Sequence, residues 1–117
     1  MKILSKLNTI QTKLNVPKNQ HNKFGNFNYR SSEDILEAVK TLLQETKTVL
    51  TITDEVILIG ERYYVKATAT LKDAESGEEV SSTGWAREDE SKKGMDSSQL
   101  TGSTSSYARK YALNGLL

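Results

Sequence analysis

Residues 99–113 combine hydroxyl, aromatic and basic side chains at spacings that suit a single helix. Tyr107 and Tyr111 are four residues apart, and Arg109 and Lys110 are adjacent between them. Tyrosine rings can stack on bases and cations can pair with phosphates, and a protein that holds single-stranded nucleic acid uses both. This segment therefore predicts a nucleic-acid-binding helix.

The two tyrosines and the two basic residues of this helix each have an alternative interpretation. The tyrosines share one helical stripe with Leu100, Thr104 and Ala108, which is typical of a buried face, so for both rings we favour core packing over base stacking. Arg109 and Lys110 lie off this stripe. We expect them to contact phosphates, with solvated surface charge as the alternative.

The order of residues 102–113 resembles the closing motif of a known family. It runs Gly-Ser-Thr-Ser-Ser-Tyr-Ala-Arg-Lys-Tyr-Ala-Leu. Members of the ERF (essential recombination function) family of phage single-strand annealing proteins typically have a glycine, small residues and then Thr-Tyr-Ala-Arg-Arg-Tyr-Ala-Leu. Ser106 replaces the threonine of that motif, and Lys110 replaces its second arginine.

The resemblance covers residues 18–117, because residues 23–30 and 93–96 also resemble blocks of the ERF family. It implies a protein that binds single-stranded DNA and anneals complementary strands in phage homologous recombination, without ATP, in the cytoplasm of a bacterial host. It also implies a β-β-β-α core like that of the eukaryotic recombination mediators, and head-to-tail association of subunits into a ring or helical array. The expected partners are single-stranded DNA, the annealed duplex and further copies of the chain.

Basic residues elsewhere, and one loop tyrosine, extend the predicted DNA-binding set. The candidates for DNA contact are Arg109, Lys110, Lys92, Lys93, Arg87, Lys23, Arg30 and Tyr29. Phe24 and Phe27 lie in the same glycine-containing loop as the tyrosine and could also stack on bases, although we favour anchoring of both rings to the core. We expect Trp85 to be structural, and the lone His21 to be exposed rather than catalytic or metal-binding.

The net charge of +1 conceals a segregation of charge along the chain. Residues 1–30 carry +6 and residues 91–117 carry +3, whereas residues 31–59 and 60–90 carry −4 each. We expect the two basic ends to converge on one face that binds a polyanion, with scattered solvated lysines as the alternative.

The sequence lacks the signatures of several classes of enzyme. Without cysteine it has no disulfide or thiolate metal site, and it has neither a Walker A loop for ATP nor a Gly-x-Ser-x-Gly elbow. The Glu-x-Lys elements at residues 45–47 and 90–92 fall at a helix end and in a polar loop, which disfavours a metal-dependent nuclease. We therefore predict no catalytic residue, no metal site and no cofactor. The competing function is a partner-binding or scaffold module with incidental basic ends.

The hydrophobic pattern predicts the elements that position these residues. The predicted elements are helices over 2–15 and 32–46, strands over 49–59, 62–71 and 79–87, and a last helix that begins at Ser97 or Ser98. Ser31 and Asp34 form a capping box before the second helix. Gly102 costs about 1 kcal/mol relative to alanine inside a helix. We therefore expect the glycine to let the helix approach another element or a neighbouring subunit closely, and the alternative is that the helix merely tolerates it. The order predicts an α+β fold in which a three-stranded antiparallel meander packs against helices.

The length of 117 residues predicts a single domain, and its abrupt apolar end at residues 115–117 suggests a piece of a longer protein with a further C-terminal region. This end and an apolar stripe on the first predicted helix together make more apolar surface than we expect one copy to bury, which favours a homo-oligomer. The stripe consists of Ile3, Leu7, Ile10 and Leu14. A monomer that packs the stripe and the apolar end internally is the alternative.

The longest apolar run, residues 56–59, is too short to span a membrane, and the N-terminus lacks the apolar region of a signal peptide. We therefore expect a soluble cytoplasmic protein.

Overall fold

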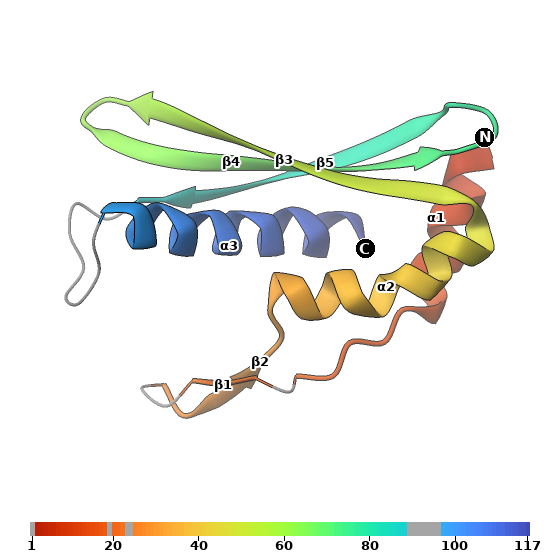
Figure 1. The fold of residues 1–117 in the computed structure, drawn as a ribbon, viewed down its shortest axis with the longest axis horizontal. Coiled ribbons are helices and arrows are strands. Elements are labelled where there is room, and N and C mark those ends of the chain that lie inside the picture. The colour runs from red at the N-terminus through yellow and green to blue at the C-terminus, as the bar shows by residue number, and fades with distance from the viewer. Residues whose placement is uncertain (1, 19, 23–24, 89–96) are drawn as a thin grey trace. The chain divides into compact units, whose positions relative to one another are not determined.

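The helices and long strands follow one another in the predicted order. The computed structural model describes residues 2–18, 20–22, 25–88 and 97–117. Its elements (Figure 1) are α1 (Lys2–Lys13), β1 (Gln20–Asn22), β2 (Phe27–Tyr29), α2 (Ser32–Thr46), β3 (Thr48–Ile59), β4 (Arg62–Asp73), β5 (Glu79–Arg87) and α3 (Ser97–Leu116). The order β3-β4-β5 forms a three-stranded sheet. The predicted α+β fold with a β-β-β-α core is confirmed.

The chain divides into two compact units. Unit 1 comprises Met1–Val49, Leu71–Val80 and Leu117, and unit 2 comprises Leu50–Thr70 and Ser81–Leu116. Unit 1 therefore contains α1, the β1–β2 hairpin and α2, whereas unit 2 contains α3 and most of the three-stranded sheet.

Backbone hydrogen bonds set the register of β4 against β5. The amide of Asp73 donates to the carbonyl oxygen of Glu78, and the amide of Glu88 donates to that of Tyr63, both at 2.8 Å. The two bonds belong to one antiparallel register, in which every second facing pair lacks direct hydrogen bonds and brings its side chains closer together. At the other end of β4, Gly60 with φ +63° begins the two-residue turn from β3, as in a type II′ hairpin turn.

In unit 2, one face of the sheet is buried and the other is open. The sequence of residues 62–71 alternates between two sets of side chains, which predicts that the face containing Val65, Ala67 and Ala69 packs against a helix and that the other is wet. This is confirmed, because these three residues of β4 are buried and the residues between them are partly exposed. Gly84 of β5 is buried on the same face. Tyr63, which belongs to this face by alternation, is nevertheless an exposed side chain. The buried face is therefore lined by small residues, and a helix can lie close to it.

α3 approaches β5 closely at Gly84. A Cβ atom there would meet the carbonyl oxygen of Ala108 and the amide nitrogen of Ala112, and would lie 2.8 Å from the Cβ of Tyr111. These atoms belong to the helix backbone or are fixed to it, so they can move only if α3 moves. The sequence predicted such an approach at Gly102, but apart from the backbone of α3 itself and the two neighbouring residues, no described atom lies within 4 Å of a Cβ placed there.

In unit 1, α1 and α2 pack against each other through apolar stripes. Ile3, Leu7 and Ile10 of α1 are buried. The buried apolar residues of α2 are Ile35, Val39 and Leu42. Leu14, the last residue of the predicted stripe, is partly exposed. At the end of the chain, Leu116 of unit 2 is buried and Leu117 is partly exposed. One copy therefore buries most of these apolar residues, and association of copies stays a prediction.

The start of α2 is fixed by the predicted capping box. Ser31 Oγ accepts a hydrogen bond from the Asp34 amide at 3.2 Å, and Asp34 Oδ2 accepts one from the Ser31 amide at 2.9 Å. The Ser31 amide holds the pKa of the Asp34 carboxyl below its usual value, because it stabilises the charged form. Two otherwise unpaired backbone amides are thus satisfied at the first turn.

The connection between α1 and α2 differs from the prediction. The sequence predicts an irregular connection with a short extended piece near Tyr29. The extended piece is present as β2, but residues 20–22 pair with it as an antiparallel hairpin, with Gln20 opposite Tyr29. His21 Nδ1 lies 2.9 Å from Asn28 Oδ1 across this hairpin and is exposed, as predicted. Strands of three mostly polar residues carry too little alternation for a sequence pattern to reveal them.

A buried carboxylate joins α1 to the turn between β4 and β5. Asp73, whose side chain is fully buried, accepts a hydrogen bond from Lys6 Nζ at 2.9 Å. The amide of Glu75 and the hydroxyl of Ser76 also donate to the Asp73 carboxylate, at 2.9 and 3.0 Å. The Lys6 ammonium is the main cause that holds the pKa of Asp73 well below its usual range, and Asp73 in turn raises the pKa of Lys6.

This pairing predicts a pH dependence of stability. Because the folded pKa of Asp73 is depressed, its contribution is present above the unfolded value of 3.8 and is lost as the pH falls toward the folded pKa. We expect the urea midpoint of Asp73→Asn to lie below that of the parent chain at pH 7, with the gap narrowing below about pH 4. Glu75→Gln, which changes an exposed partner of the same Lys6, is the control and should change the midpoint less. An equal gap for Asp73→Asn at pH 7 and pH 2 would contradict the assignment.

Candidate nucleic-acid interface

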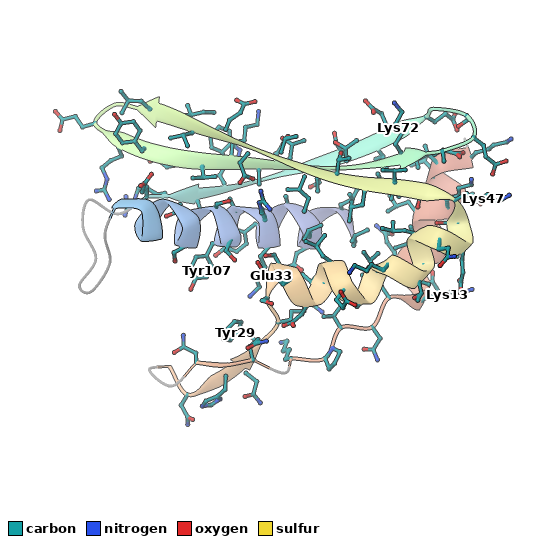
Figure 2. The ribbon with its side chains drawn as sticks, in the orientation of Figure 1. Lys13, Tyr29, Glu33, Lys47, Lys72 and Tyr107 are labelled. Atoms are coloured by element: carbon teal, nitrogen blue, oxygen red, sulfur yellow. The ribbon has the colours of Figure 1, made fainter. Side chains whose placement is uncertain are left out.

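α3 carries both predicted tyrosines at its surface. Tyr107 is 51% exposed and Tyr111 is 53% exposed, and Tyr107 extends from α3 on the side away from the sheet (Figure 2). The prediction that both rings pack in the core is therefore wrong. The stripe that α3 buries includes Thr104, Ala108 and Ala112 instead. The sheet beneath is lined by glycine and alanine, and the helix lies too close to it to leave room for a tyrosine ring.

Lys110 lies on the same side of the helix as the tyrosines. It is three residues after Tyr107 and adjacent to Tyr111, and residues three apart are neighbours on a helix surface. Its side chain is partly exposed. We call Tyr107, Lys110 and Tyr111 the α3 strip. Two exposed rings beside a cation form the combination that stacks on bases and pairs with phosphates.

Arg109 extends from the other side of α3 and is paired with Asp54 of β3. Its Nε lies 3.2 and 3.1 Å from the two carboxylate oxygens, and its Nη2 lies 3.1 Å from Oδ2. The hydroxyl of Ser105 also donates to Asp54 Oδ2. These contacts tie α3 to β3 within unit 2. Residues two apart on a helix do not face each other, so Arg109 is separated from the α3 strip.

The pairing with Asp54 leaves part of the Arg109 guanidinium available. A guanidinium has five N–H donors, and the contacts with Asp54 use Nε and one N–H of Nη2. The Arg109 side chain remains 40% exposed. Arg109 can therefore hold α3 in place and still present N–H groups to an outside anion.

Arg87 lies on the face of the sheet opposite to α3. Along β5, Gly84 and the alternate positions face the helix, so Trp85 and Arg87 face outward, and both are exposed. Lys66 of β4 is opposite Trp85 in the register, and its Nζ lies 5.5 Å from the centre of the ring. Trp85, which the sequence suggested to be structural, is 43% exposed. The fold therefore separates Arg87 from Arg109.

The remaining predicted DNA-binding residues fall elsewhere. Tyr29 ends β2, Arg30 follows it, and both belong to unit 1 and are partly exposed. The residues outside the described part of the chain are Lys23, Phe24, Lys92 and Lys93. Convergence of the two basic ends on one face stays a prediction.

Two residues that contact the predicted groups, on opposite faces of the sheet, carry no signal of their own in the sequence. Asp54 contributes only to the acidic middle of the chain, and Lys66 lies within the predicted strand over 62–71. The contact between Asp54 and Arg109 joins residues 55 apart in the chain, and no local pattern signals it. The alternation in β4 and β5 put Lys66 and Trp85 on sheet faces, but only the register brings them together.

Across the residues that the structure describes, no helix is long and apolar enough to cross a membrane. Within the same ranges, no group of three or more histidine, aspartate or glutamate side chains is arranged to hold a metal ion.

Comparisons with known proteins give one family and one curated relative. The sequence profile of the ERF superfamily matches residues 3–117. The chain is 60% identical over 112 residues to a protein of Salmonella phage P22 named "Essential recombination function protein". This alignment covers 96% of the chain and 53% of the phage protein, so the chain spans about half the length of that relative. No solved structure matches.

Proposed function

Because this chain belongs to the ERF superfamily, we propose that it binds single-stranded DNA and anneals complementary strands in phage homologous recombination, without ATP. The name of the 60% identical phage P22 protein supports a role in recombination. The observation that supports the finer proposal is the α3 strip, with its two half-exposed tyrosines and Lys110. An annealing protein needs no chemical step, so it needs a surface that holds DNA rather than an active site.

The proposed mechanism follows from what annealing requires. The protein must hold a strand by its phosphates and leave base edges free to pair with a second strand. In this proposal, phosphates pair with Lys110 and with the N–H groups of Arg109 that Asp54 does not use, and the tyrosine rings offer stacking surfaces worth about 1–3 kcal/mol per base. The further residues proposed for DNA contact are Lys92, Lys93, Arg87, Lys23, Arg30 and Tyr29. Such binding is weakly selective for sequence and weakens as salt rises.

Assembly is part of the proposal. In the described sheet β3 and β5 are the edge strands, and β3 is a 12-residue strand with exposed Val56, Leu58 and Ile59. A long, apolar edge strand readily pairs with another strand. Pairing of β3 in one copy with β5 in the next joins two different surfaces, which builds a ring or a helical array. Such an array aligns the α3 strips of successive copies and raises affinity for a long strand.

The test is annealing of two complementary oligonucleotides, one labelled, in the absence of ATP and with light scattering measured on the same samples. We expect pairing to be faster with the protein than without it, and the scattering mass to be a multiple of 13.1 kDa. Raising the salt should slow the protein-dependent reaction, because phosphate contacts release counterions. The same protein after heat denaturation serves as the control.

Each readout can contradict its part of the proposal. Equal annealing rates with and without protein would exclude strand annealing. A mass of 13.1 kDa that does not change when single-stranded DNA is added would exclude the array. A partner-binding or scaffold module, the competing function, predicts no salt-dependent binding of labelled single-stranded DNA.

A further inference from the structure

The outer face of β4 and β5 in unit 2 is a second surface with the chemistry of a nucleic-acid platform. Its side chains stand in facing pairs that lack direct hydrogen bonds, so each pair is close. The pairs are Tyr64 with Arg87, Lys66 with Trp85, Thr68 with Thr83, and Thr70 with Ser81. None of the eight is aliphatic or acidic, so the face suits a polar, anionic partner better than an apolar protein surface.

Trp85 is the centre of this surface. Its ring is 43% exposed, and Lys66 Nζ lies 5.5 Å from the ring centre, within the range of a cation–π contact. Arg87 is exposed two positions further along β5, and alternation puts it on the same face. A stacking ring is therefore flanked by one cation across the ladder and another along the strand. The two-residue turn at Gly60 and Glu61 puts Glu55 of β3 beside Lys66 on the same face, so one acid borders the group on its β3 side.

We propose that this face binds single-stranded DNA, with a base stacked on Trp85, flanking phosphates paired with Lys66 and Arg87, and hydroxyls of the threonine pairs donating to the sugar-phosphate backbone. The inference rests on the proposed function, since it concerns the same ligand. It adds a contact surface separate from the α3 strip. Because α3 covers the opposite face of this part of the sheet, one nucleotide cannot touch both surfaces of a single copy.

The sequence allows a direct test, because Trp85 is the single tryptophan of the chain. A base stacked on the indole quenches its fluorescence, so titration with an oligothymidine strand reports on this residue alone. The fluorescence anisotropy of a labelled strand reports binding anywhere on the protein. We expect quenching that saturates over the same range of DNA concentration as the anisotropy.

Charge variants make the test specific to the face. In Lys66→Gln/Arg87→Gln, the DNA concentration for half-maximal quenching should rise about tenfold or more, because both cations that flank the stacked base are removed. Lys40→Gln/Lys47→Gln removes the same charge from exposed positions of unit 1 and is the matched control. It should leave half-maximal quenching within about twofold of the parent value, because neither lysine belongs to β4 or β5. Trp85→Phe keeps a ring, so its binding by anisotropy should exceed that of Trp85→Ala.

The outcomes separate this inference from the proposed function. Binding by anisotropy without any change in tryptophan fluorescence would overturn the outer-face site and leave strand binding at α3 intact. Absence of binding by both readouts would overturn both proposals. Quenching produced by concentrating the protein without DNA would show that the face contacts another copy instead, and would also overturn the inference.

Discussion

Replacement of Gly84 with alanine is expected to destabilise the fold by about 2–3 kcal/mol, which is the upper range for overpacking a core by one carbon. The added Cβ would meet backbone atoms of Ala108 and Ala112 and the Cβ of Tyr111. A flexible side chain could turn away from it, but these atoms can give way only if α3 moves off β5. Because the α3 strip lies on this helix, DNA binding should weaken together with stability. Urea unfolding followed by circular dichroism, and anisotropy with labelled DNA, measure the two effects.

Gly102→Ala is the matched control, since it makes the same chemical change within α3. Apart from the backbone of α3 itself and the two neighbouring residues, no described atom lies within 4 Å of a Cβ at Gly102, so alanine should stabilise the helix by about 0.5–1 kcal/mol. The two variants change the entropy of the unfolded chain alike, and the difference between them isolates the close contact of α3 with β5. A Gly84→Ala protein as stable as the Gly102→Ala protein would contradict the observed packing.

Removal of the charges at Arg109 and Lys110 is expected to have the largest effect on DNA binding. A hydrogen bond to a charged group is worth about 1.5–3 kcal/mol, so Arg109→Gln/Lys110→Gln should weaken single-strand binding on the order of 100-fold or more at low salt. The slope of log affinity against log salt should flatten by about one unit for each lost phosphate contact. Lys40→Gln/Lys47→Gln, which removes two charges from exposed positions of unit 1, is the control for net charge. Affinity measured by anisotropy at several salt concentrations tests the expectation.

The ion pair with Asp54 requires a further comparison, because Arg109 also holds α3 against β3. Asp54→Asn weakens that attachment without removing a cation. If Arg109 contacts DNA directly, Asp54→Asn should bind at least as tightly as the parent chain, since a competing carboxylate is gone. If Asp54→Asn instead loses as much affinity as Arg109→Gln, Arg109 acts only by positioning the helix.

Local patterns in the sequence determined the elements of this fold. The predicted second helix, residues 32–46, coincides with α2, because Ser31 and Asp34 supply a capping box that acts within one turn. The alternation along β4 identified its buried face, and this signal is also local, because successive side chains in a strand point to opposite sides. The resemblance carried by residues 102–113 and earlier blocks identified the family, which the match over residues 3–117 confirms. Each of these signals needs only residues close together in the chain.

Tertiary packing decided which of these residues form a surface. A stripe containing Tyr107 and Tyr111 is compatible with burial, but small residues on the sheet, Gly84 among them, bring α3 so close that the rings remain outside. The partner of Arg109 is Asp54, on a strand 55 positions earlier. The contact between Lys66 and Trp85 depends on the register of β4 against β5, and a shift of one residue would turn one side chain to the other face. The sequence by itself thus determined periodicity and capping, which are local, whereas exposure, ion pairing and register depend on how distant segments pack and were decided by the tertiary structure.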